Sequence, residues 1–167
     1  MIADRCVVMP IPKTAQTARS TKNGKLKRDH SCGVVPVRVY AGKRYYLLVQ
    51  HVAGHWGFPK GHPDHGESPT ETALRELAEE TGLTDCGLIE RPPFREEYVF
   101  TKRSGKTVIK DVTYFIGLVS DQAATPAEGE ITDLYWGDAK QTRKRLTFDE
   151  GRALLDEVEV FLDAQAV

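Results

Sequence analysis

The sequence predicts one α/β or α+β domain built around a mixed β-sheet. A length of 167 residues suffices for one domain and is short for two. Strand-like segments occur both before and after one long internal helix, and a second amphipathic helix lies near the end of the chain. Periodicity alone does not separate the two fold classes any further.

The first predicted elements form a hairpin. Residues 31–39 (SCGVVPVRV) are apolar and rich in β-branched side chains, and residues 44–50 (RYYLLVQ) return after a turn at residues 40–43. Residues 51–66 are rich in glycine and proline but also contain Trp56 and Phe58, so we expect a structured loop there.

Capping residues mark both ends of the internal helix. Ser68 is a suitable N-cap, Pro69 suits the first helical position, and Glu71 completes a Ser-x-x-Glu capping box. Gly82 suits the left-handed position that follows a helix, with Leu83 as the apolar residue that packs back. The helix therefore begins at Pro69 and ends before Gly82.

The second half of the chain adds three strands and a helix. Residues 94–101 and 107–120 are predicted strands joined by a short connection, and residues 131–136 follow a loop as a shorter strand. Thr147 and Glu150 have the spacing of a second capping box and predict the start of the terminal helix. Its apolar stripe consists of Leu154, Leu155, Val158, Phe161 and Leu162.

Three glutamates on the internal helix suggest a metal site. Glu76, Glu79 and Glu80 share one helix face, with Cβ atoms roughly 5–6 Å apart, and they repel one another. Two of them lie in the last turn, where the helix dipole disfavours negative charge. Mg²⁺, which prefers carboxylate oxygens, would relieve this repulsion. On these residues alone, a solvated acidic face is the commoner explanation.

The surrounding pattern favours the metal site. Residues 61–83 (GHPDHGESPTETALRELAEETGL) resemble the Nudix box, G-x5-E-x7-R-E-U-x-E-E-x-G-U with U aliphatic, at every specified position. The resemblance implies an α/β/α sandwich with a mixed sheet between helices. It also implies hydrolysis of a nucleoside diphosphate linked to another group, with Mg²⁺ or Mn²⁺ as the cofactor.

The same resemblance assigns roles to residues. Glu76, Glu79 and Glu80 would be metal ligands, with the backbone carbonyl of Gly61 as a further ligand. Glu79 or Glu130 would be the general base, and the sequence does not choose between them; Glu130 is also a candidate ligand. The remaining roles are those of Arg75, which would orient a glutamate, Glu67, which would anchor the loop, and Gly82, which would end the helix.

Residues outside the box resemble a subgroup of this family, the asymmetrical diadenosine tetraphosphate hydrolases. Residues 56–62 (WGFPKGH) match its W-x-x-P-K-G-H run, and residues 94–98 (FREEY) match its F-x-R-E-x-x-Y region except for one missing residue. The likeness implies that Lys60, His62 and Lys110 contact phosphates and that Tyr98 stacks on adenine. Water would then attack a terminal phosphate of the bridge, releasing ATP and AMP.

Other interpretations stay open at this stage. Trp56, Phe58 and Tyr98 could instead be packing residues of the loop and sheet. The subgroup often has a tyrosine at the position of Leu134, whereas here the tyrosine is Tyr135, on the opposite strand face. Alternative functions are hydrolysis of diphosphoinositol polyphosphates, hydrolysis of capped or triphosphorylated RNA, and a Nudix-fold binding module without catalysis.

The N-terminal segment differs in composition from the rest. Seven of the 23 lysines and arginines, but only one of the 24 acidic residues, fall within residues 1–28. We therefore expect residues 1–30 to be a flexible basic extension that could touch RNA, and residues 31–167 to be the hydrolase domain. A weak match to a secretory signal and the lack of a membrane-length apolar run predict a cytoplasmic protein. The resemblance implies that its partner is a nucleotide substrate.

Overall fold

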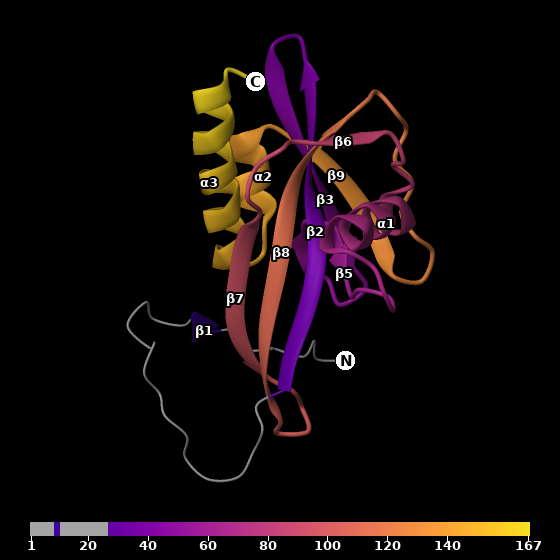
Figure 1. Ribbon diagram of the computed structural model, residues 1–167, viewed down its shortest axis with the longest axis vertical. Coiled ribbons are helices and arrows are strands. Elements are labelled where there is room, and N and C mark those ends of the chain that lie inside the picture. The colour runs from indigo at the N-terminus through magenta and orange to yellow at the C-terminus, as the bar shows by residue number, and fades with distance from the viewer. Residues whose placement is uncertain (1–8, 11–26) are drawn as a thin grey trace.

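The computed structural model describes residues 9–10 and 27–167, which fold into one sheet with helices on both sides (Figure 1). The elements in chain order are β1 (Met9–Pro10), β2 (Lys27–Tyr40), β3 (Lys43–His51), β4 (Trp56–Gly57), β5 (Lys60–Gly61), α1 (Pro69–Thr81), β6 (Cys86–Leu88), β7 (Phe94–Thr101), β8 (Thr107–Val119), β9 (Ile131–Gly137), α2 (Ala139–Arg145) and α3 (Asp149–Gln165).

The sheet is mixed, as the sequence predicts. The main path of hydrogen-bonded strands is β1-β7-β8-β2-β3-β4, with β5 paired to β2, β6 to β8 and β9 to β3. The long strands β2 and β8 run parallel, from the pair Lys27 and Val108 to the pair Val37 and Leu118. The remaining described pairings are antiparallel.

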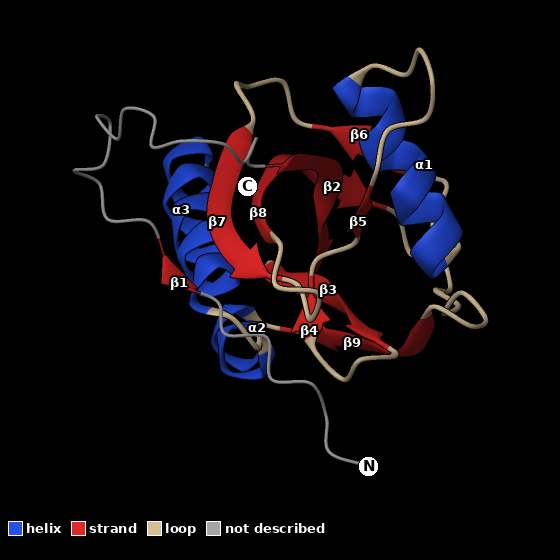
Figure 2. Ribbon diagram, turned by 90° about the horizontal axis from the view of Figure 1, so that it is seen from below, coloured by secondary structure: helices blue, strands red, loops and turns tan. Residues whose placement is uncertain are grey.

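The sheet lies between α1 on one face and α2 with α3 on the other (Figure 2). Alternation along β3 shows how both faces are buried: Leu47 packs in the cluster with α1, whereas Tyr46 and Leu48 pack in the cluster with α3. The α/β/α sandwich implied by the resemblance is therefore confirmed.

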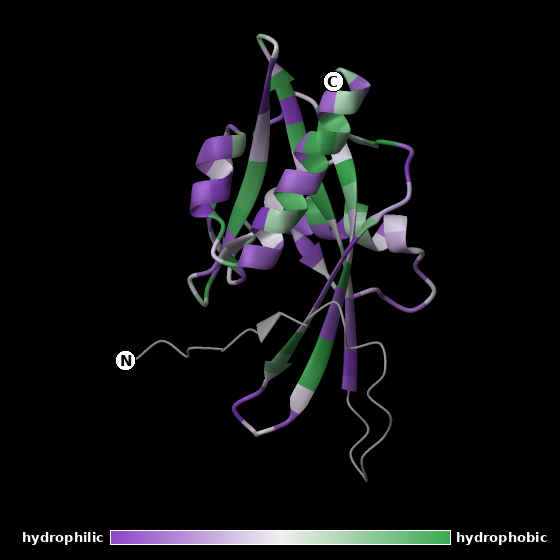
Figure 3. Ribbon diagram, turned by 90° about the vertical axis from the view of Figure 1, so that its left-hand side faces the viewer, coloured by the Kyte–Doolittle hydropathy of each residue, from purple (hydrophilic) through white to green (hydrophobic). Residues whose placement is uncertain are grey.

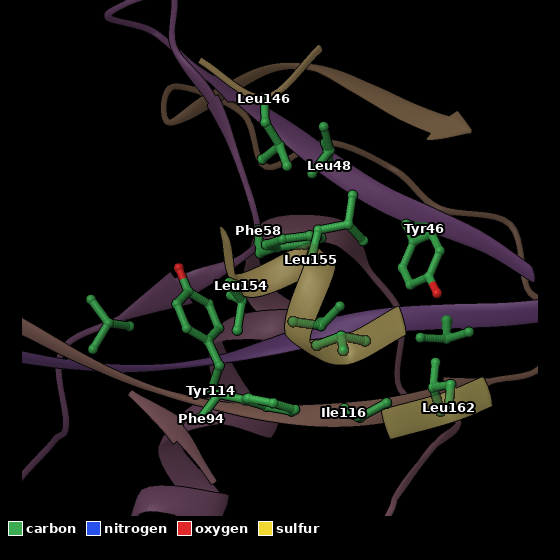
Figure 4. Packing of buried hydrophobic residues seen from close by; sticks show 14 residues of the cluster. Tyr46, Leu48, Phe58, Phe94, Tyr114, Ile116, Leu146, Leu154, Leu155 and Leu162 are labelled. Carbon is green, nitrogen blue, oxygen red and sulfur yellow. The ribbon is translucent and has the colours of Figure 1, made fainter. Parts of the chain in front are cut away.

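The larger core cluster lies between the sheet and α3. Figure 4 shows Leu154, Leu155 and Leu162 of α3 gathered with Tyr114, Ile116 and other side chains of the strands. Figure 3 shows that the middle of the sheet is hydrophobic and that α3 carries both hydrophobic and hydrophilic residues. Burial of one face of α3 thus holds this helix against the sheet.

Helix α1 confirms the predicted capping at both ends. Ser68 is the N-cap and forms a complete capping box with Glu71, and Pro69 occupies the first turn. Gly82 follows the helix with φ 72°, a left-handed conformation, and donates its N–H to the carbonyl of Ala78. These local interactions determine where the glutamates of α1 stand along the helix.

The second predicted capping box is wrong. Helix α3 has Phe148 as its N-cap, without a side-chain hydrogen bond. The hydroxyl oxygen of Thr147 instead accepts the backbone N–H of Trp56 at 2.8 Å. A complete capping box does form at Asp138 and Gln141, at the start of α2, a helix that the sequence analysis does not predict. Thr147 is therefore used to tie β4 to the segment before α3.

Several element boundaries differ from the predictions. β2 begins at Lys27, before the expected domain boundary, and β4 and β5 lie in the expected loop. Residues 1–8 and 11–26 lie outside the described residues, and most of the expected basic extension falls there. Among the residues that are described, no helix has the length and apolar character needed to cross a membrane.

Candidate active site

Arg75 links the loop before α1 to the glutamates on it. Its guanidinium donates to Glu67 at 2.7 and 3.0 Å, to Glu76 at 2.9 Å and to Glu79 at 2.9 Å. It also donates to the backbone carbonyl of His62 at 2.8 Å. One planar cation with fixed donors thereby orients two of the three candidate metal ligands.

Glu67 anchors the loop that precedes the helix. Besides Arg75, its carboxylate accepts the backbone N–H of Asp64 at 2.9 Å and the hydroxyl of Thr72 at 2.9 Å. The hydrogen bonds from Arg75 and from the Asp64 backbone lower the pKa of Glu67 to about 2. The residue stays ionised and joins the loop to α1, as the resemblance implies for this position.

Glu80 and Glu76 are the buried members of the cluster. Burial raises the pKa of Glu80 to about 8, although Lys60 opposes the shift and donates its backbone N–H to the carboxylate at 3.2 Å. Burial also raises the pKa of Glu76, against the effect of Arg75. The negative charge of Glu130 contributes to both increases, so this loop residue lies near the helix cluster.

Gly61 lies directly against Glu76. A Cβ atom placed on Gly61 would stand 2.0 Å from the Cδ atom and 2.1 Å from the Oε1 atom of Glu76. Real Cβ atoms essentially never approach that closely, so only glycine leaves this carboxylate in place. The backbone of Gly61 and the side chain of Glu76 therefore share one small space.

The donor set suits a hard divalent cation. Glu76, Glu79 and Glu80 supply carboxylate oxygens, the ligands that such a cation prefers. The pKa of Glu80 is raised because its negative charge is buried and only partly compensated by neighbouring groups. As the described side chains stand, no three acidic, histidine or cysteine groups converge closely enough to hold a metal ion. In this arrangement the Nη1 atom of Arg75 donates to both Glu76 and Glu79.

A cavity of about 690 Å³ lies beside the glutamate cluster. Its walls are largely aromatic and include Trp56, Phe58 and Tyr114, with residues from the start of α3. Lys60 lines this cavity, while its own backbone contacts Glu80 and its neighbour Gly61 contacts Glu76. Strand β5 therefore forms the boundary between the cavity and the acidic cluster.

Strand β7 contributes three residues to the cavity. Glu96, Tyr98 and Phe100 alternate along the strand and all line the space, as expected for one face of a β-strand. Tyr98 therefore lies where a ligand in the cavity would meet it, and its ring centroid is 6.3 Å from that of Phe100. The motif predicts a role for Tyr98, whereas no role is predicted for Glu96.

Two histidines of the segment expected to be a loop, residues 51–66, also line the cavity. The rings of His51 and His55 stack with centroids 4.5 Å apart. Burial, with the nearby charge of Lys60, lowers the pKa of His51 to about 4 and also lowers that of His55. Both rings are therefore neutral at neutral pH. The spacing of the two histidines in the sequence matches no metal-binding or catalytic motif. Their place in the cavity wall therefore follows only from the fold of the chain around them.

His62 and Lys110, the weaker candidates for phosphate contact, are held by Asp29. Asp29 lies 2.6 Å from the Nε2 atom of His62 and accepts a hydrogen bond from Lys110 at 3.1 Å. Lys110 also donates to Ser31 at 2.6 Å and is only 6% exposed. His62, Lys110 and Asp29 do not line the cavity. Asp29 is a charge partner of Lys110 that the sequence does not predict.

Trp56 and Phe58 differ in their surroundings. Phe58 is buried in the core against Tyr114, which fits a packing residue, whereas Trp56 is half-buried. Arg145 stacks on the rings of both Trp56 and Tyr135. Leu134 packs with the cluster on the α1 side of the sheet. Because the tyrosine is at position 135 and not 134, its ring lies on the other side, in edge contact with Trp56.

Comparisons with known proteins identify the family. The family model described as the NUDIX domain matches residues 30–156. The chain is 36% identical over 120 residues to the asymmetrical bis(5′-nucleosyl)-tetraphosphatase of Rattus norvegicus, covering 70% of this chain and 80% of the relative. It is 30% identical over 134 residues to the enzyme of the same name from Caenorhabditis elegans, covering 79% and 95%.

A solved structure is similar over nearly its whole length. The binary complex of a C. elegans Ap4A hydrolase superposes with a TM-score of 0.72 and 28% sequence identity. The match covers 81% of this chain and 98% of that chain.

Proposed function

Because this chain belongs to the Nudix family of hydrolases, which act on phosphoanhydride bonds, we propose that it cleaves diadenosine tetraphosphate to ATP and AMP with Mg²⁺. The observation that carries the proposal is the position of β5. Lys60 lines an aromatic cavity of nucleoside size, and its backbone contacts the acidic helix. The relatives named above support this choice of substrate.

The cation would be held by Glu76, Glu79 and Glu80, with Glu130 and the carbonyl of Gly61 as further candidates. When bound, Mg²⁺ neutralises phosphate oxygens and lowers the pKa of a coordinated water. Arg75 would keep Glu76 and Glu79 oriented from the side of the loop. Burial of Glu80 favours a ligand role for this residue, because a cation compensates the charge that solvent cannot reach.

The proton acceptor must reach both water and the substrate. Glu79 has 59% of its side chain exposed, so its carboxylate is accessible from the solvent side of the helix. Glu130 is also exposed, and its backbone carbonyl accepts the N–H of Val52 beside the cavity loop. We propose Glu79 as the general base, with Glu130 as the competing candidate.

The cavity would hold one nucleoside of the substrate. A volume of about 690 Å³ lies within the common range for small-molecule sites, roughly 300–1,000 Å³. Tyr98 would stack on the base, and Lys60 would contact the phosphates between the cavity and the acidic helix. An inositol polyphosphate would need a strongly basic pocket instead, and here Lys110 is already neutralised by Asp29.

The test is product analysis after incubation with diadenosine tetraphosphate and Mg²⁺. We expect equal amounts of ATP and AMP, with turnover reduced at least about 100-fold in Glu79→Gln, the scale of loss for a general base. Glu157→Gln is the matched control, because it removes an exposed carboxylate of α3 far from this cluster.

Other outcomes would change the assignment. Two molecules of ADP would contradict the asymmetric cut. Turnover of an inositol pyrophosphate or of capped RNA, without turnover of the dinucleotide, would contradict the nucleoside cavity but retain the hydrolase. Absence of metal-dependent turnover of all three substrates would indicate a binding module.

A further inference from the structure

Glu96 is a half-buried acid on the cavity wall that the proposed reaction does not use. Its Oε1 atom is buried and has no hydrogen-bond partner. Within the described part of the chain, the only other side-chain atom in this state is Nη1 of Arg91. A buried carboxyl oxygen without a partner costs on the order of 1–3 kcal/mol, so its presence beside an open cavity calls for a ligand.

The surroundings of Glu96 offer the oxygen no partner from the protein. Its neighbours on the cavity face of β7 are the aromatic rings of Tyr98 and Phe100. The charged or titratable groups that face the same space are Lys60, Glu150 of α3, Tyr98, Tyr114 of β8, His51 and His55. Both histidines are neutral at neutral pH, so Lys60 is the one cation among these cavity groups.

Aromatic walls with a buried, unpartnered carboxyl oxygen match the chemistry of a nucleobase. The flat faces of a base bind aromatic rings, and its edge carries hydrogen-bond donors and acceptors in a fixed order. We propose that Glu96 reads the edge of the purine that enters the cavity, pairing with adenine as the neutral acid and with guanine as the carboxylate. This inference rests on the proposed function, since it assigns the base specificity of the same site.

The hydrogen-bond donors and acceptors of each base determine which protonation form of Glu96 it can bind. Adenine presents an acceptor at N1 and a donor at the 6-amino group, which match the hydroxyl and carbonyl of a carboxylic acid. Guanine presents donors at N1 and at the 2-amino group, which match the two oxygens of a carboxylate. Burial, opposed by Lys60 and reinforced by Glu150, raises the pKa of Glu96 to about 7. Both forms are therefore accessible close to neutral pH.

The test measures binding of AMP and GMP by titration calorimetry at pH 6 and pH 8.5. The two ligands carry the same phosphate, so titration of that group cancels in the ratio of their dissociation constants. In the wild-type chain we expect the preference for AMP over GMP to fall at least about tenfold as the pH rises, the scale of one bidentate pair.

Two variants separate the role of Glu96 from general effects of charge. Glu96→Gln carries a donor and an acceptor at all pH values, so it should prefer AMP at both pH 6 and pH 8.5. Glu97→Gln removes the same charge from the opposite, exposed face of β7 and should retain the pH-dependent change. Thermal unfolding of each variant confirms that the compared proteins are folded.

The outcomes overturn or support the inference independently of catalysis. A preference that does not change with pH in the wild type, or that changes equally in Glu96→Gln, contradicts base reading by Glu96. Failure of both nucleotides to bind contradicts it as well. The predicted change together with absent turnover of diadenosine tetraphosphate would support Glu96 as the base reader and contradict the proposed reaction.

Discussion

Close contact between Gly61 and Glu76 ties one backbone position to the position of a candidate metal ligand. A Cβ atom at residue 61 would overlap the carboxylate of Glu76, which is the far end of a flexible side chain. The carboxylate could move away at little cost to the fold. The proposed reaction requires the carboxylate to stay in place, so stability and activity should respond differently to a substitution here.

Gly61→Ala should therefore lower kcat at least about 100-fold while changing the free energy of unfolding by less than about 1 kcal/mol. The measurements are turnover of diadenosine tetraphosphate and urea unfolding. Gly87→Ala, in β6 and outside the cavity lining, is the control, because a Cβ there meets no atom within 4 Å. Full activity in Gly61→Ala would show that the position of Glu76 does not matter.

Glu96 makes a separate prediction about stability and pH. Its pKa is raised from 4.5 to about 7, so the folded protein binds more protons than the unfolded chain between these values. The contribution of Glu96 to stability is thus greatest below about pH 4.5 and falls as the pH rises through 7. Glu96→Gln should remove this decrease, on the order of 2–3 kcal/mol. Denaturant unfolding of both proteins at pH 5 and pH 8 measures it, and parallel profiles would contradict it.

At the scale of elements, local chemistry explains which predictions succeed. Ser68, Glu71 and Gly82 interact with their own helix, so nearby residues suffice to predict both ends of α1. Thr147 and Glu150 have the same spacing, but Thr147 bonds to Trp56, which is 91 residues away in sequence. Tertiary contacts of this kind compete with local capping and leave no trace in the spacing.

Gly82 provides the test of helix termination. Alanine at this position must adopt φ 72°, which costs an L-residue with a side chain about 1–2 kcal/mol. Gly82→Ala should therefore lower the free energy of unfolding by about that amount and leave KM nearly unchanged. Gly87→Ala, at a glycine of β6 with ordinary φ and open space, should have a smaller effect. Equal losses in urea unfolding would contradict the explanation.

At the scale of the molecule, the site combines one contiguous motif with residues brought together by the sheet. The acidic helix could be predicted because the Nudix box is a single segment of 23 residues. The cavity could not, because its walls come from β3, β4, β7, β8 and α3. Asp29 and Lys110 show the same limit: parallel pairing of β2 and β8 makes them neighbours across 81 positions.

In the proposed reaction, the phosphates of the substrate would lie at β5, between the cavity and the acidic helix. A nucleoside in the cavity leaves the adjacent phosphate nearest to the glutamates of α1, so that phosphate should be the one attacked by water. The orientation therefore determines which product receives the oxygen atom of the solvent.

The most direct test is hydrolysis of diadenosine tetraphosphate in water labelled with ¹⁸O, followed by mass spectrometry of the products. We predict that the label appears in AMP and not in ATP, because water attacks a terminal phosphate of the bridge. Glu79→Gln should form labelled AMP at least about 100-fold more slowly, because the label still enters through the same attack. Label in ATP, or in ADP, would contradict the placement of the substrate across β5.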